Sequence, residues 1–180
     1  MIKSVDIDKV FQETITKLQS GHRVFLEFTN EEFQFLLNYW SSNLNDTEKL
    51  HKVLCLLDFT KNPSPLFTNI ILKSFQDLTN QETLIYVLNV FRKHEVERSF
   101  KTGDRINGDL LMALKELLTK ADGELLEWCL RTIEELGHQS IFFKQDVLDK
   151  KPSWILCYNK NNKASRQIIE LLEKRWSRKL

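Results

Sequence analysis

The chain has 180 residues, a formal net charge of +1, and a composition that is 42% hydrophobic and 28% charged. This length suits one domain, and this composition is typical of a globular protein and excludes a disordered tail. Five glycines and three prolines are few, and twelve phenylalanines favour long, packed helices over an all-β design. We therefore expect an all-α fold with one repeat domain over residues 1–180.

Three features of the sequence bear on location. The first residues are partly acidic and show no basic stretch followed by an apolar run, so we predict no signal peptide. No apolar run approaches the roughly 18 residues that a membrane span needs, so we expect a cytoplasmic protein without a membrane partner. The odd number of cysteines, Cys55, Cys129 and Cys157, suits buried thiols in a reducing compartment better than a disulfide framework.

The charge is unevenly distributed along the chain. Residues 144–180 hold ten Lys or Arg against four Asp or Glu, which gives about +6, and residues 1–143 hold sixteen against twenty-one, which gives about −5. Such segregation indicates an interaction surface in the C-terminal region, and the alternative of two solvated faces stays open.

The N-terminal part of the chain predicts three helices. Residues 6–20 show apolar side chains near 3.6-residue spacing, and Gly21 follows as a cap. Residues 22–28 alternate partly like a strand, but a strand here would have no partner, so we expect an extended linker or a short helical turn. Helices over residues 29–42 and 45–57 should then pair as a helical hairpin.

The rest of the chain predicts further helices separated by clear breaks. Pro63 and Pro65 mark the strongest break, and Pro65 suits a first helical turn. Residues 94–108 lack clean periodicity, so we expect an irregular loop of the length that is often functional or mobile. Seven helical ranges are predicted from Pro65 onwards, at residues 65–78, 79–94, 107–120, 123–136, 140–148, 152–158 and 161–178. With the three before Pro65 these are ten ranges, for an expected total of about nine helices.

The segment from Leu72 to Phe91 resembles a later segment of the same chain. A shift of 42 residues places several of its residues on identical or similar ones. The pairs are Leu72 with Leu114, Lys73 with Lys115, Glu82 with Glu124, Leu84 with Leu126, Tyr86 with Trp128, Val87 with Cys129, Leu88 with Leu130 and Phe91 with Ile133. A shift of 34 residues relates residues 44–54 to residues 78–88 in the same way. We interpret this self-similarity as an irregular helical repeat.

Two helices per roughly 42 residues resemble the HEAT and armadillo group of repeats over about residues 33–176. The resemblance implies antiparallel helical hairpins stacked as a short α-solenoid, with a groove lined by the second helix of each pair. Pro65 is similar to the proline of the first HEAT helix, but the second copy lacks a matching proline, so the subfamily stays open. The tetratricopeptide pattern is absent.

The resemblance implies a non-enzymatic protein-interaction or scaffold module that binds a protein or peptide along this groove. The candidate partner-binding residues are Lys93, Lys101, Arg105, Arg131, Arg166, Lys174 and Arg178. The alternative is nucleic-acid binding through the basic region 144–180, as in HEAT-like alkylpurine DNA glycosylases. An enzyme of unrecognised type is a third hypothesis, although the sequence holds no catalytic or cofactor motif.

Several small groups of residues are candidates for chemical sites. His51 and Cys55 stand four residues apart on a predicted helix, but two ligands are too few, so we expect no metal and no cofactor. The neighbouring carboxylates Glu95 and Glu97, like Glu134 and Glu135, are interpreted as solvated helix faces rather than acid–base pairs.

The tryptophans are interpreted mainly as core residues. Trp40, Trp128 and Trp154 lie in apolar contexts. Trp176 lies among cations, where it could stack on a nucleic-acid base, but it also continues an apolar stripe on the last predicted helix. We favour the packing interpretation for Trp176.

Overall fold

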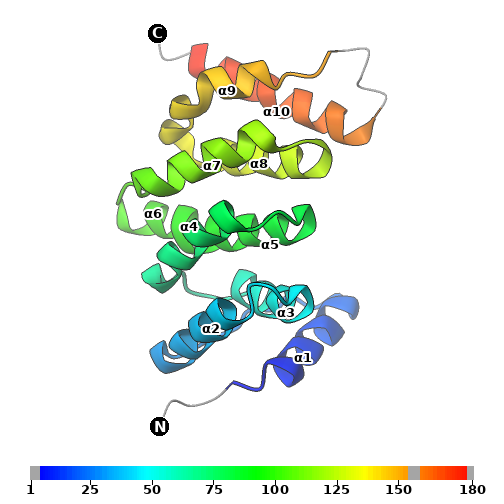
Figure 1. The fold of residues 1–180 in the computed structure, drawn as a ribbon, viewed down its shortest axis with the longest axis vertical. Coiled ribbons are helices and arrows are strands. Elements are labelled where there is room, and N and C mark those ends of the chain that lie inside the picture. Colours follow the sequence, from blue (N-terminus) through cyan, green and yellow to red (C-terminus); the bar gives the residue numbers. More distant parts are fainter. Residues whose placement is uncertain (1–4, 154–158, 178–180) are drawn as a thin grey trace. The chain divides into compact units, whose positions relative to one another are not determined.

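The computed structural model describes residues 5–153 and 159–177, and these residues form an all-α structure (Figure 1). Its α-helices are α1 (Ile7–Gln19), α2 (Asn30–Ser42), α3 (Thr47–Asp58), α4 (Thr68–Asp77), α5 (Gln81–Phe91), α6 (Glu97–Thr102), α7 (Gly108–Lys120), α8 (Gly123–Glu135), α9 (Lys144–Asp149) and α10 (Lys160–Ser177). Short 3-10 helices cover Pro65–Phe67 and Gly137–Phe143, and a π-helix covers Arg92–Val96. No helix in the described ranges is both long and apolar enough to cross a membrane.

The predicted all-α class is confirmed. Where helical segments adjoin, they join into nine continuous helices within the described residues, as expected from the sequence. The helix predicted over residues 140–148 is a 3-10 helix that continues into α9. The helix predicted over residues 152–158 falls almost wholly on residues 154–158, which lie outside the described part of the chain.

Polar side chains fix the starts of most of these helices. Asp6, Thr29, Asp46, Asn80 and Asn107 each accept a hydrogen bond from a backbone N–H in the first turn of the helix that follows. These N–H groups have no partner within the helix, so the caps satisfy them and set where each helix begins. Because these capping residues can be recognised in the sequence, most predicted helix starts lie within a residue or two of the observed starts.

Residues 22–28 are extended, as one of the two predicted alternatives requires, but they do have a partner. The N–H of Leu26 donates to the carbonyl oxygen of Phe59 at 2.8 Å, and the carbonyl of Leu26 accepts from the N–H of Lys61 at 2.8 Å. These bonds form an isolated parallel bridge between Leu26 and Thr60. The expectation that this segment would pair with nothing was therefore wrong, because one bridge suffices to tie the linker to the end of α3.

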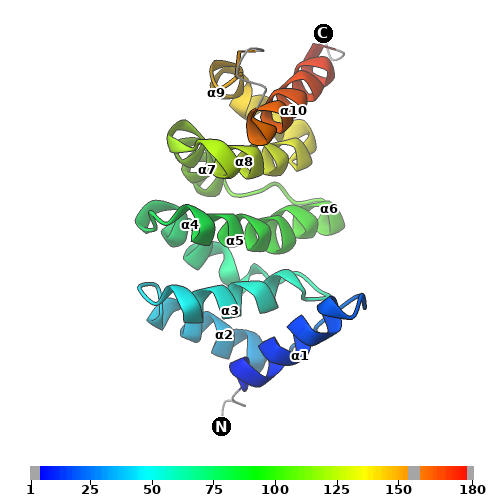
Figure 2. The ribbon, with the colours of Figure 1, turned by 90° about the vertical axis from the view of Figure 1, so that its right-hand side faces the viewer.

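The prediction of an irregular loop over residues 94–108 is wrong. The π-helix and α6 continue α5 without a break as far as Thr102 (Figure 2), and non-helical backbone follows only from Gly103 to Asn107. The apolar periodicity disappears here because the π-helix buries two polar side chains, His94 and Glu95, where a regular amphipathic helix would bury apolar ones.

Gly103 ends this long helix with a left-handed backbone conformation, at φ 76°. Because a Cβ at this position would meet no atom within 4 Å, the backbone conformation alone opposes a side chain. We therefore expect Gly103→Ala to lower the free energy of unfolding by about 1 kcal/mol. Urea unfolding would measure the loss, and an unchanged or higher stability would show that the helix end can relax into another conformation.

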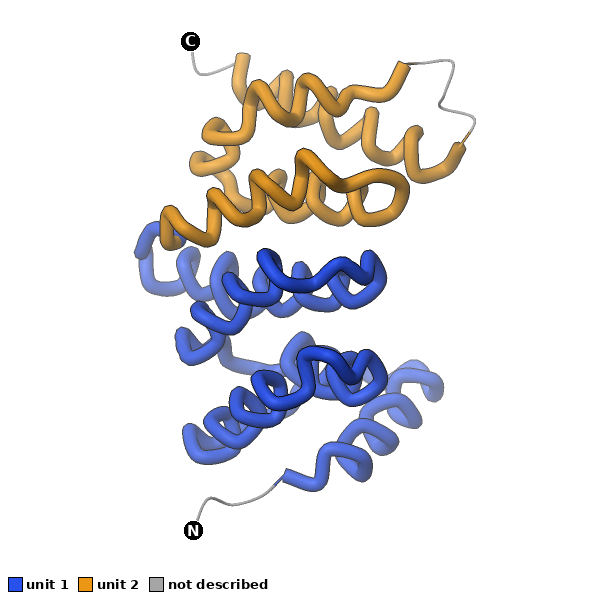
Figure 3. Tube along the Cα trace, in the orientation of Figure 1, with its two compact units in different colours: residues 1–106 blue, residues 107–180 orange. Residues whose placement is uncertain are grey.

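The chain divides into two compact units, residues 1–106 and residues 107–180 (Figure 3). In the first unit α3 contacts α1, α2 and α5, and α4 contacts α2 and α5. Its core holds the fully buried side chains of Leu36, Trp40, Leu50, Leu54, Leu56, Leu57, Phe67, Ile71, Leu88 and Phe91. Leu50, Leu54 and Leu57 belong to the apolar stripe of α3.

In the second unit, α8 packs against both α7 and α10, and α9 packs against α7. Trp176 is buried on α10, and its indole Nε1 donates to the Ser140 hydroxyl at 3.1 Å. The packing interpretation of Trp176 is therefore confirmed, and base stacking by this side chain is excluded while α10 stays in place. The expectation of one repeat domain over residues 1–180 stays a prediction.

Helices α5 and α8 bury the same positions relative to the 42-residue shift. The buried residues of α5 are Thr83, Leu84, Val87, Leu88, Val90 and Phe91, and those of α8 are Leu125, Leu126, Cys129, Leu130, Thr132 and Ile133. All six positions coincide. In α4 and α7 the agreement is partial, since Ile70 is buried and its counterpart Met112 is exposed.

Candidate functional site

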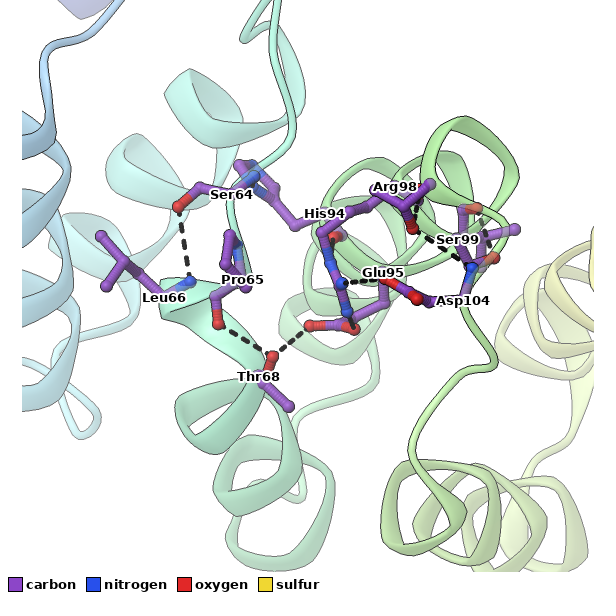
Figure 4. A network of polar contacts seen from close by, with 11 residues as sticks. Ser64, Pro65, Leu66, Thr68, His94, Glu95, Arg98, Ser99 and Asp104 are labelled. Carbon is purple, nitrogen blue, oxygen red and sulfur yellow. Dashed lines mark hydrogen bonds and ion pairs between the residues drawn. The ribbon is translucent and has the colours of Figure 1, made fainter.

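A buried polar network surrounds the π-helix and is the most distinctive polar feature of the first unit (Figure 4). His94 and Glu95 lie on the π-helix and are both fully buried. Ser64 reaches the network from the segment before α4, Thr68 from the first position of α4, and Arg98 from α6. Single π-turns inside α-helices occur often at functional sites, which makes this network a candidate for chemistry.

The hydrogen bonds of His94 fix its tautomer. Nδ1 accepts from the backbone N–H of Ser64 at 3.0 Å, so it carries no proton, and Nε2–H points to the carbonyl oxygen of Leu57 at 3.0 Å. The ring also packs edge-on against Phe33 and Phe67, with its centroid 4.8 Å from that of Phe67. Burial lowers the pKa of His94 to about 4, because a charged imidazole would lose its hydration there.

Glu95 is held from two sides. The Arg98 guanidinium donates to one carboxylate oxygen at 2.7 Å, and the Thr68 hydroxyl donates to the other. The Glu95 side chain has no exposed surface, whereas Arg98 keeps 21% of its side chain exposed. A buried carboxylate with a cation on one oxygen and a hydroxyl on the other is satisfied as a structural group.

This network joins structural elements and leaves no group placed for catalysis. Both ring nitrogens of His94 are engaged, and so are both oxygens of Glu95. A general acid or base must be able to reach a reacting atom, and neither residue has exposed surface. The interpretation of Glu95 as part of a solvated face was wrong, because the π-helix turns it into the core.

The sequence carried one signal for this network. The 42-residue shift places His94 on Leu136 and Glu95 on Gly137, so the second copy ends where the first continues. Gly137 has a φ of 59° and follows the last turn of α8. The self-similarity of the two copies ends at this histidine and this carboxylate. At this point the first copy continues as a π-helix, whereas α8 of the second copy ends.

The partner-binding residues predicted in the first unit fall into two groups. Lys93 and Lys101 both pair with Glu97, at 2.7 Å each, one turn to either side of it. The Lys93 side chain is only 16% exposed, which makes it a poor contact residue. Arg105 is exposed in the non-helical segment after α6.

The residues predicted in the second unit lie on two helices. On α8, Arg131 pairs with Glu127 at 2.6 Å and stands 6.0 Å from the ring centroid of Trp128. On α10, Arg166 pairs with Glu170 at 2.9 Å, and Lys174 is exposed. Arg178, the last candidate, lies outside the described residues.

The cysteine and histidine pair weighed as metal ligands has other surroundings. His51 Nε2 lies 2.9 Å from the Thr83 hydroxyl, and the ring lies 4.5 Å from that of Tyr86. Burial raises the pKa of Cys55 to about 11 and also raises the pKa of Cys129, so both are kept as thiols at neutral pH. Within the described residues no three His, Cys, Asp or Glu side chains gather as a metal site would require. Cys157 lies outside them.

Trp40 is fully buried, as predicted, and Trp128 is half-buried on α8. Trp154 lies outside the described part of the chain. A half-buried tryptophan beside an arginine is an amphipathic surface feature, so the interpretation of Trp128 as a core residue holds only in part.

Comparison of the chain with known protein families, with curated proteins and with solved structures found no match.

Proposed function

We propose that the chain is a non-enzymatic protein-interaction module of HEAT- or armadillo-like helical hairpins. The observation that supports it most is the coincidence of all six buried positions of α5 and α8 at the 42-residue shift. In a helical repeat each unit buries one face on its neighbours and presents the other to a partner. The same face is therefore available on both helices.

The exposed sides of these two helices have the composition of a binding surface. Tyr86 on α5 and Trp128 on α8 occupy equivalent positions, and both are half-buried. The residues one turn further on are Asn89 and Arg131. Tyr, Trp and Arg are among the residues that dominate the binding energy of protein–protein contacts.

Nucleic-acid binding through residues 144–180 has less support. Trp176 is buried, and Arg166 and Arg175 already bind Glu170 and the Glu134 side chain. A base-stacking platform needs exposed aromatic rings, and phosphate binding favours free guanidinium groups.

Arg131→Glu is the sharpest test of the proposed surface. Arg131 is 48% exposed, so we expect the fold to tolerate the change, although it removes the ion pair with Glu127 and places a second carboxylate one turn away; Lys93, at 16% exposed, is a poorer position for this test. The variant should capture its protein partner at least about tenfold more weakly from a lysate treated with nuclease, with partners identified by mass spectrometry. Lys120→Glu on α7 is the matched control, since it makes the same charge change on an exposed residue of a first helix. Equal capture by both variants would contradict the assignment of this face.

A further inference from the structure

Helix α10 presents two opposite faces of different chemistry. Ile169, Leu172 and Trp176 are buried, and α10 packs against α8. On the other side, Lys160, Lys163, Gln167, Leu171 and Lys174 are all exposed. At 100° per residue these five fall within about 80° of the helix circumference, and they extend over about 21 Å. We call these five residues the α10 stripe.

The lysines of the stripe are not neutralised by their neighbours. Within the described residues, the carboxylates nearest to the stripe along α10 are already engaged, since Glu170 pairs with Arg166 at 2.9 Å and Glu173 pairs with Lys151 at 2.5 Å. Neither carboxylate is shared with a lysine of the stripe. The stripe therefore carries three positive charges and no negative charge.

Leu171 places one apolar side chain between the lysines of the stripe. It is 55% exposed and lies one turn before Lys174 and about two turns after Lys163. A single exposed leucine is ordinary on a protein surface. Here it stands in line with three unpaired cations, so a partner that matches the stripe needs carboxylates at both ends and an apolar side chain between them.

We propose that the α10 stripe docks an acidic, amphipathic segment of a partner protein, with its carboxylates on Lys160, Lys163 and Lys174 and an apolar side chain on Leu171. This inference rests on the proposed interaction function and names the chemistry of one partner surface. Charge complementarity along a helix steers association and sets register. A nucleic-acid strand fits less well, because the stripe has no exposed aromatic side chain and no arginine, and it exposes a leucine between its cations.

The test uses the full chain and a labelled helical peptide of 15 residues with glutamate and leucine on one face. Fluorescence anisotropy should show binding that weakens by about tenfold between 50 and 300 mM NaCl, because exposed ion pairs are screened. A peptide with glutamine in place of every glutamate should bind at least about tenfold more weakly. Strong binding of a labelled single-stranded oligonucleotide with no binding of the glutamate peptide would overturn the proposal in favour of nucleic acid.

Matched triple variants locate the binding. The combination of Lys160→Glu, Lys163→Glu and Lys174→Glu should raise the peptide Kd at least about tenfold. The combination of Lys9→Glu, Lys73→Glu and Lys120→Glu makes the same change in net charge on exposed lysines outside α10 and should raise it less than about threefold. Equal losses in both would show a net-charge effect and refute the stripe. Leu171→Ser should weaken binding of the glutamate–leucine peptide about threefold without changing the salt dependence.

Failure of this inference can be told apart from failure of the proposed function. If the natural partner is lost with Arg131→Glu but kept by the α10 triple variant, the interaction function stands and the stripe is the wrong surface. If the glutamate peptide binds through the stripe while no natural partner depends on Arg131, the stripe stands and the face of α5 and α8 is wrong. Circular dichroism of each variant confirms that the helices are intact.

Discussion

Lowering the pH from 7 to 4.5 is expected to destabilise the wild-type chain by about 2 to 3 kcal/mol more than it destabilises the His94→Gln variant. The imidazole of His94 is buried, and its pKa falls from 6.5 to about 4 in the folded chain. Between these values the unfolded chain binds a proton that the folded chain does not. Stability from the neutral ring is therefore fully present above pH 6.5 and is lost as the pH falls towards 4.

The neighbouring charges do not change this direction. Lys93 lowers the pKa of His94 further and Glu97 raises it, while loss of hydration is the largest cause. Protonation at Nδ1 would also remove the acceptor of the Ser64 N–H. Because carboxylates elsewhere titrate in the same range, the informative quantity is the difference between the two chains.

Urea unfolding at pH 7, 6, 5 and 4.5, followed by far-ultraviolet circular dichroism, would measure this difference. The glutamine side chain of the variant cannot take up a proton, and its amide can still donate to the Leu57 carbonyl. We expect the variant to be less stable at pH 7, because it loses the ring contacts with Phe33 and Phe67. Parallel stability curves across the pH range would show that His94 is not buried in its neutral form.

Most helices were predictable from the sequence because their caps and apolar stripes are local signals. Thr29 and Glu32 form a reciprocal capping box three residues apart, and the first turn of α2 follows at once. The stripe of α3 needs only the spacing of its leucines. Neither signal depends on the rest of the chain, so both can be recognised in the sequence without knowledge of tertiary contacts.

The π-helix could not be predicted in this way, because its residues are explained only by distant partners. The Ser64 N–H that satisfies His94 lies 30 residues earlier, and the Thr68 hydroxyl that binds Glu95 lies 27 residues earlier. Without these partners, a histidine and a glutamate look like surface residues of a loop. The bridge from Leu26 to Thr60 was missed for the same reason, since its two sides are far apart in sequence.

The candidate binding residues were chosen by charge and helix position, and the structure separates them by their ion pairs. Lys93 and Lys101 share the carboxylate of Glu97 at i,i+4 spacing, which the sequence could not indicate while residues 94–108 were expected to form a loop. On α10, Arg166 pairs with Glu170, whereas Lys174 lies on the exposed stripe. Charge counts identify a basic region, but only the pairing of side chains shows which charges are open to a partner.

Glu95→Ala is expected to lower the free energy of unfolding by about 3 kcal/mol, because it removes one partner of a buried ion pair. The Glu95 carboxylate is fully buried, and its loss takes one acceptor from each of two donors. The Thr68 hydroxyl keeps the Pro65 carbonyl at 2.9 Å, and the Arg98 guanidinium keeps the His94 carbonyl at 3.3 Å. Part of the effect will be relieved because Arg98 is 21% exposed and can turn towards water. Urea unfolding at pH 7 would measure the change.

Glu97→Ala is the matched control, because Glu97 lies two residues further on and pairs with Lys93 and Lys101 at the surface. Its side chain is 37% exposed, so screening by water should limit the loss to less than about 1 kcal/mol. Equal losses would mean that burial does not distinguish the two carboxylates. A strong loss in Glu95→Ala alone would show that the buried carboxylate cannot be removed by itself. If the double variant Glu95→Leu with Arg98→Met then recovers the stability, an apolar pair of similar size replaces the ion pair. The π-helix would in that case depend on a filled core without unpaired polar groups, and not on the charges themselves.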